Sequence, residues 1–156
     1  DLHSFPTRRS SDLHSLADPA LAVATLQMNE RSLRRDWQTF GLVFENLCVR
    51  DLLVYARALP DASEDPVHYY RDDSGLEADA IVEQADGRWA AIEVKLGEDK
   101  VDEAAAHLLR LERKLTSNER ARMQPPEFLA VVVGLARQAY RREDGVYVIP
   151  AGCLGP

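Results

Sequence analysis

Residues 75–95, GLEADAIVEQADGRWAAIEVK, decide how this chain folds. The segment predicts two β-strands, over residues 76–83 and 89–96, joined by a tight turn at residues 85–88. The turn contains Asp86-Gly87, and Asp-Gly between two apolar runs is a strong signal for a β-hairpin. The sequence therefore predicts an antiparallel strand pair at the centre of the fold.

Charged residues interrupt the apolar pattern of this hairpin. Strict alternation along the first strand predicts Glu77, Asp79 and Ile81 on one face, and Ala78, Ala80 and Val82 on the other. On the second strand Glu93 and Lys95 lie two residues apart and so point the same way. Charged groups are costly to bury unless they are paired or bound to a metal. The hairpin is therefore a candidate functional site.

The elements on either side of the hairpin predict an α/β fold. The expected elements are a short helix from Asp18-Pro19 to residue 26, a loop or single turn over 29–36, a long helix over 37–59, a loop over 61–66, a strand over 67–71, a helix over 101–115, a loop over 117–126, a buried strand over 128–135 and a last hairpin over 139–142 and 146–149. Proline ends the long helix at residue 60, and three consecutive valines suit a strand buried on both faces. The order α-β-β-β-α-β predicts a mixed sheet flanked by helices.

The N-terminal segment does not fit this pattern. Residues 1–13 have no helical or strand periodicity, and FPTRRSSDL resembles the translation of a widely used sequencing-library adapter. We expect a non-native segment over 1–13, a helical preface over 14–36 and one domain over 37–156; a natural, flexible basic arm is the alternative for the first segment. If residues 1–13 are non-native, the gene extends upstream and the chain is a C-terminal part of a longer protein.

Composition limits the classes of protein to consider. The 156 residues suit one domain with a core, and 46% hydrophobic with 29% charged residues is ordinary for a globular protein. The net charge of -7 argues against a strongly basic nucleic-acid surface without excluding a local groove. The sequence predicts a cytoplasmic protein with no membrane partner. Its two cysteines lie far apart, it shows no signal-peptide pattern, and no apolar run approaches the roughly 20 residues that span a bilayer.

The charged residues of the hairpin suit a divalent metal. Asp79 and Glu93 could supply two carboxylates to Mg²⁺ or Mn²⁺, which usually takes one or two together with waters and substrate phosphates. Lys95 could then orient or deprotonate a water and stabilise charge on the phosphate. Glu45 of the long helix could be a further metal ligand or a base. Glu77 could reach the metal, or it could pair with Lys95 or Arg71.

These residues resemble a known superfamily. Gly41-Leu42-Val43-Phe44-Glu45, Gly75-Leu76-Glu77-Ala78-Asp79 and Ile92-Glu93-Val94-Lys95 look like the PD-(D/E)XK nucleases, which have the restriction-endonuclease-like fold. More closely, residues 41–156 resemble the domain of unknown function that follows an AAA-type ATPase module in many prokaryotic ATP-binding proteins. The resemblance implies that Asp79, Glu93 and Lys95 take the signature positions and Glu45 the helical acid. Alanine precedes Asp79 where the signature has proline, and no phosphate-binding loop of an ATPase occurs in the chain.

Two functions remain open at this stage. One is a Mg²⁺- or Mn²⁺-dependent nuclease that hydrolyses DNA, in preference to RNA, with an upstream ATPase module as its partner. The other is a catalytically silent module of the same fold that binds nucleic acid or protein as an accessory of the ATPase. The full set of signature residue types favours the first function, and the acidic net charge favours the second. The oligomeric state is left open.

Overall fold

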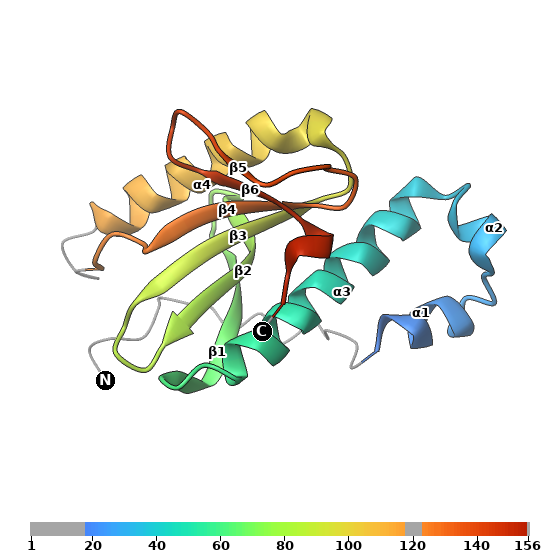
Figure 1. Cartoon of the computed structure of the whole chain (residues 1–156), viewed down its shortest axis with the longest axis horizontal. Helices are drawn as coiled ribbons and strands as arrows, with labels where there is room; N and C mark the ends of the chain where they lie inside the picture. The colour runs from blue at the N-terminus through green and yellow to red at the C-terminus, as the bar shows by residue number, and fades with distance from the viewer. Residues whose placement is uncertain (1–17, 118–122, 156) are drawn as a thin grey trace.

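A six-stranded mixed sheet with helices on both faces forms the centre of the computed structural model, which describes residues 18–117 and 123–155 (Figure 1). The strands are β1 (Ala62–Arg71), β2 (Glu77–Gln84), β3 (Trp89–Lys95), β4 (Phe128–Val133), β5 (Tyr140–Arg141) and β6 (Tyr147–Pro150). Their order in the sheet is β1-β2-β3-β4-β6-β5. Strands β3, β4 and β6 run parallel, and the other neighbours are antiparallel. The expected mixed α/β architecture is confirmed, whereas residues 1–13 lie outside the described part.

Four α-helices lie in the described ranges. They are α1 (Pro19–Thr25), α2 (Glu30–Leu33), α3 (Trp37–Arg57) and α4 (Val101–Thr116); the short 3-10 helices η1 (Glu98–Lys100) and η2 (Ala151–Cys153) accompany them. Asp18 caps α1 by accepting the N–H of Ala20, with proline in the first turn as the sequence predicts. Helices α1 and α2 pack against α3 (Figure 1). No helix in the part of the chain that the structure describes is long and apolar enough to cross a bilayer.

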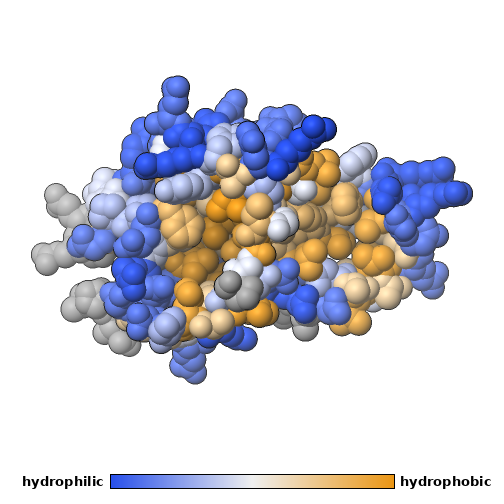
Figure 2. Space-filling view, viewed as in Figure 1, coloured by the Kyte–Doolittle hydropathy of each residue, from blue (hydrophilic) through white to orange (hydrophobic). Residues whose placement is uncertain are grey.

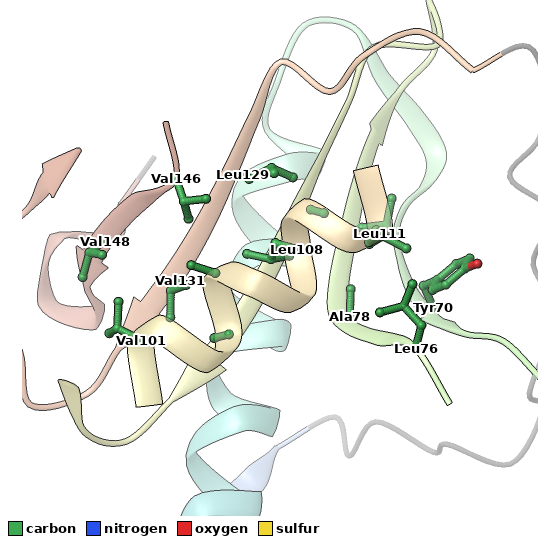
Figure 3. Close-up of a cluster of buried hydrophobic side chains, with 14 of the residues drawn as sticks. Tyr70, Leu76, Ala78, Val101, Leu108, Leu111, Leu129, Val131, Val146 and Val148 are labelled. Carbon is green, nitrogen blue, oxygen red and sulfur yellow. The ribbon is translucent and has the colours of Figure 1, made fainter. Parts of the chain in front are cut away.

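Helices α3 and α4 bury opposite faces of the sheet. Leu108 and Leu111 of α4 are fully buried against strand residues that include Ala78 and Val131, and Figure 3 shows these side chains together. On the other face, Cys48 of α3 is buried in a second cluster, which also contains Ile92 and Val94 of β3. Strands β3 and β4 are thus covered from both sides, which explains their nearly continuous apolar sequence.

Strand β1 starts earlier than the sequence predicts. Residues 61–66 were expected to form a loop, but β1 begins at Ala62, which pairs with Gln84. The next pair is Val67 with Val82, so five steps along β1 correspond to two along β2. Pro66 is tolerated there because β1 is an edge strand, where a missing N–H costs no ladder hydrogen bond. The loop prediction was wrong because the residues favour a turn locally, whereas pairing with β2 makes them part of a strand.

A β-bulge in β2 breaks the alternation predicted for the hairpin. Tyr70 pairs with Ala78 and His68 pairs with Ile81, so three steps on β2 face two on β1. Ala78 and Ile81 consequently lie in the same cluster under α4, although strict alternation puts them on opposite faces. The predicted grouping of side chains along residues 77–82 is therefore wrong. The bulge includes Asp79, the first acid of the candidate site.

Asp72 ties the β1–β2 turn to the end of α4. One carboxylate oxygen accepts the N–H groups of Ser74 and Leu76 at 2.7 and 3.1 Å, and the other lies 2.6 Å from Nζ of Lys114. Burial works to raise the pKa of Asp72, but the hydrogen bonds from Lys114 and Ser74 outweigh it and hold the pKa below its usual range. The carboxylate therefore stabilises the folded chain in its ionised form.

Replacement of Asp72 with alanine should lower the free energy of unfolding by about 1–2 kcal/mol at pH 7, since several hydrogen bonds to a charged group are lost. The folded-state pKa is depressed, so this stabilisation is present above the unfolded pKa near 3.8 and lost as the pH falls below it. Urea unfolding at pH 7 and pH 3 measures both effects. Substitution of the exposed Glu64 is the control, and an equal loss at the two pH values contradicts the prediction.

Candidate functional site

The candidate site lies where strands β2 and β3 stop pairing. Their last cross-strand pair is Ala80 with Ile92, although β2 begins at Glu77 and β3 continues to Lys95. Beyond this pair, Oδ2 of Asp79 accepts the N–H of Val94 at 2.7 Å. The carboxylate of Asp79 thus takes the place of a backbone carbonyl in the ladder. The backbone N–H of Val94 on the neighbouring strand fixes the position of this carboxylate.

Lys95 lies between Asp79 and Glu93 and pairs with both. Its Nζ lies 2.6 Å from Oε2 of Glu93 and 3.6 Å from Oδ2 of Asp79. The side chains of Glu93, Asp79 and Lys95 are 3%, 10% and 29% exposed, respectively. The structure therefore brings together three residues that the sequence analysis singled out, in a site that is mostly shielded from water but open at the lysine.

Burial shifts the titration of both acids. Burial, and secondarily the charge of Asp79, raises the pKa of Glu93 to about 7, while Lys95 opposes the shift. The pKa of Asp79 is also raised by burial, against the opposing effects of Lys95 and the N–H of Val94. Burial acts to lower the pKa of Lys95, but the charges of Asp79 and Glu93 outweigh it, and the net pKa is raised. Lys95 is therefore a cation at neutral pH.

Glu45 belongs to the electrostatic surroundings of this cluster but is not bonded to it. It lies on α3, is half-buried, and makes no hydrogen bond or ion pair with the residues that the structure describes. Burial, and then the charge of Asp79, raises the pKa of Glu45 to about 7; Lys95 lowers it in part. The sequence left two roles open for Glu45, a metal ligand or a base. A role as ligand is not visible in its contacts, whereas a carboxyl group that titrates near neutral pH suits a proton acceptor.

Glu77 faces different partners from those of Asp79. Its Oε2 accepts the hydroxyl of Tyr69 at 2.8 Å and lies 3.9 Å from Nε of Arg71. Of the alternatives left open for Glu77, the structure selects the pair with Arg71. Tyr69 was not expected from the sequence as a partner of Glu77, although Tyr69 and Arg71 lie two residues apart on the strand next to β2 and so share a face. Burial, and secondarily the hydrogen bond to Glu77, raises the pKa of Tyr69 to about 12.

The residues present fit a divalent metal only in part. Within residues 18–117 and 123–155, no group of three or more His, Cys, Asp or Glu side chains is gathered closely enough to hold an ion. Mg²⁺ does not need three, because waters and substrate oxygens commonly complete its shell. Oε1 of Glu93 is buried and has no hydrogen-bond partner in the described part of the protein. A buried carboxylate oxygen of this kind is normally satisfied, so Glu93 is the residue that best suits the ion. Asp79, which shares Lys95 with Glu93, is the second carboxylate within the cluster.

The fold and the site together define a mixed α/β domain with a buried carboxylate–lysine cluster at the point where two central strands separate. Residues 40–154 match the family model of a domain of unknown function, DUF4143, and the chain belongs to this family. The match contains Glu45, Glu77, Asp79, Glu93 and Lys95, whereas α1 and α2 precede it. No curated protein and no solved structure matches the chain. The prediction of a domain of unknown function is confirmed, and membership of the PD-(D/E)XK superfamily stays a prediction.

Proposed function

We propose that the domain is a metal-dependent phosphodiesterase that hydrolyses nucleic acid, DNA in preference to RNA, with a restriction-endonuclease-like fold of the PD-(D/E)XK type. The observation that carries the proposal is the contact of Lys95 with both Asp79 and Glu93, beside a buried oxygen of Glu93 that has no partner among the described residues. Two buried acids with a lysine are an expensive arrangement for a fold to keep, and a metal and a phosphate would compensate their charges.

Asp79 and Glu93 would hold the ion, which supplies a Lewis acid that polarises the phosphate and lowers the pKa of a water. Lys95 is a cation at neutral pH because the two carboxylates raise its pKa. It would therefore orient the attacking water and stabilise negative charge on the phosphate, and would not serve as the base. Glu45, with a pKa of about 7, would accept the proton of the water. Glu77 would stay bound to Tyr69 and Arg71, and Lys95 would exchange part of its contact with Asp79 and Glu93 for the phosphate.

A second candidate function is a catalytically silent module that binds nucleic acid or protein as an accessory of an ATPase. The net charge of -7 favours it, since a protein that binds the phosphate backbone closely usually carries a basic surface. In that case the acid pair and Lys95 would be retained for the structure alone. The same experiment separates the two functions.

The test is cleavage of supercoiled plasmid and of single-stranded DNA in EDTA, Mg²⁺ or Mn²⁺. We expect metal-dependent cleavage by the wild type and a loss of about a hundredfold or more in the Asp79→Asn variant, which keeps an acceptor for Val94 N–H but removes the charge. Asp86→Asn, at the exposed turn of the same hairpin, is the matched control and should cleave like the wild type. The nuclease proposal fails if the wild type does not cleave with either metal, or if Asp79→Asn cleaves equally well.

A further inference from the structure

Three strand ends meet at the edge of the sheet that carries the candidate site. Strand β1 ends at Arg71, β2 begins at Glu77 and β3 ends at Lys95, and each of these strands is antiparallel to the next. Arg71 pairs directly with Glu77 across β1 and β2. An exposed arginine therefore lies at the same end of the sheet as Lys95, two strands away from it.

Arg71, Glu77 and Tyr69 lie on the face of the sheet that α3 covers. Their neighbours in the sequence, Tyr70 and Ala78, are buried in the cluster beneath α4. Successive side chains along a strand point to opposite faces, so the three residues point to the other side. Helix α3, which carries Glu45, packs on this side.

The charge of Glu77 reaches the acids of the candidate site. Burial is the main cause that raises the pKa values of Glu45, Asp79 and Glu93. The charge of Glu77 adds a smaller part to each of these shifts. Four carboxyl groups thus stand against two cations, Lys95 and the arginine paired with Glu77. A divalent ion would offset two charges, and the negative charge of a phosphodiester would then need the cations.

Arg71 has donors left for an anion. Its side chain is 64% exposed, and its Nε lies 3.9 Å from Oε2 of Glu77, which is beyond hydrogen-bond distance. The guanidinium also lies beside Tyr69, whose hydroxyl donates to Glu77 at 2.8 Å. A guanidinium has five N–H donors in a planar fork that matches the oxygens of a phosphate. Glu77 and Tyr69 therefore position Arg71 without using all of its donors.

The apolar surface of the domain does not suit a phosphate backbone. Figure 2 shows an apolar area over the middle of the molecule, with hydrophilic residues around it. Proteins bind the phosphates and sugars of nucleic acids with cations, polar side chains and N–H groups. An exposed cation at the margin of the candidate site is therefore the better contact for a nucleic-acid strand.

We propose that Arg71 is a substrate-binding residue of this site and that its guanidinium holds a backbone phosphate next to the scissile one. The inference rests on the proposed function and names a further contact with its substrate. Nε would stay beside Glu77 while the terminal NH2 groups bind two oxygens of the phosphate, since arginine commonly binds phosphate in this bidentate manner. Lys95 would meet the scissile phosphate, so the two cations would hold two phosphates of one strand.

Binding of oligonucleotides tests the contact separately from cleavage. Fluorescence anisotropy of labelled single-stranded and duplex oligonucleotides would be measured between about 50 and 200 mM NaCl, in EDTA and in Ca²⁺, a hard ion that carboxylates also bind. Arg71→Gln should bind about tenfold more weakly at the lowest salt concentration. The slope of log K against log salt should shrink by roughly 0.9 for the duplex and 0.7 for the single strand, the value of one phosphate contact. Arg71→Lys, which keeps the charge, should restore the slope.

Arg110→Gln is the matched control for the change in net charge. Arg110 is exposed on α4, which covers the opposite face of the sheet, and the variant has the same net charge as Arg71→Gln. It should bind both oligonucleotides like the wild type. Both variants should unfold at the urea concentration of the wild type, because surface ion pairs contribute little to stability.

Cleavage kinetics in Mg²⁺ distinguish this inference from the nuclease proposal. Arg71→Gln should raise KM about tenfold and leave kcat within about twofold, the pattern of a contact made equally in the ground and transition states. If the wild type binds without cleaving and Arg71→Gln loses affinity as expected, the phosphate contact stands and the nuclease proposal fails. The contact is overturned if the wild type binds neither oligonucleotide, if Arg71→Gln keeps the affinity and salt slope of the wild type, or if Arg110→Gln loses as much.

Discussion

Replacement of Lys95 with alanine should lower the free energy of unfolding by about 3 kcal/mol at pH 8 in EDTA. The ammonium group contacts the carboxylates of Glu93 and Asp79, whose side chains are almost fully buried. Removal of one partner from a buried ion pair leaves an uncompensated charge, which costs more than the pair itself contributes. Urea unfolding of both proteins measures the effect, and the Lys95→Ala variant should also lose metal-dependent cleavage if the proposed function is correct.

The loss of unfolding free energy in Lys95→Ala should depend on pH and on metal, and this dependence identifies its cause. Without Lys95, both carboxyl groups can be accommodated in their neutral forms, so the loss should shrink as the pH falls from 8 towards 5. Mg²⁺ should restore part of the stability, because the ion would take over the charge of the lysine. Lys100→Ala is the matched control: this exposed lysine pairs only with the exposed Glu103 among the described residues, at 3.2 Å, and surface pairs contribute little. A loss that is the same at every pH would point to packing by the lysine stem.

Replacement of Glu93 with glutamine should act in the opposite direction on stability and abolish cleavage. The pKa of Glu93 is raised from 4.5 to about 7, mainly because the side chain is buried. The unfolded chain therefore releases this proton before the folded chain does, and wild-type stability falls as the pH rises from about 4.5 to 7. Glutamine has the same shape and no charge to bury. Glu93→Gln should be more stable by about 1–2 kcal/mol at pH 8 in EDTA.

Thermal or urea unfolding at pH 4.5 and pH 8 measures this gain, which should vanish at the lower pH because Glu93 is then protonated in both states. Glu103→Gln, on the exposed first turn of α4, is the control and should show no such pH dependence. A variant that is less stable than the wild type at pH 8 contradicts the assigned burial cost. A variant that is more stable but cleaves normally contradicts the role of Glu93 in the proposed function. A variant that is more stable and cleaves less would show that the charge of Glu93 serves activity and lowers the stability of the fold.

The elements that the sequence predicts well are those set by local signals. The long helix, predicted over 37–59, is α3 (Trp37–Arg57), and the Asp86-Gly87 turn joins β2 to β3, with Gly87 at φ 85°. The helix predicted over 101–115 is α4, because its apolar residues repeat at helical spacing. The last hairpin was also foreseen, but its place was not: β6 pairs with β4 and so joins the main sheet. The pairing of strands that lie far apart in the chain, such as β4 and β6, cannot be read from local sequence patterns.

The candidate site was predicted in composition and less well in geometry. Spacing of two residues correctly places Glu93 and Lys95 side by side, as their 2.6 Å contact confirms. The bulge in β2 was missed, since an extra residue in one strand is defined by the partner strand and not by its own sequence. The partners of Glu77 on β1 were left open for the same reason. The hydrogen bond of Asp79 to the backbone of Val94 could not be read from any pattern.

The irregular start of β1 has a consequence for how the protein behaves at high concentration. A sheet with free edges can add the strand of another copy and grow into an aggregate, unless the edges are blunted. On one edge, β1 carries Pro66 and a run of unpaired residues between Ala62 and Val67. On the other edge, β5 is only two residues long. Neither edge offers a continuous row of free hydrogen-bonding groups, so both edges resist the addition of a strand from another copy. At β1 this protection comes from the same irregularity that made the strand hard to predict.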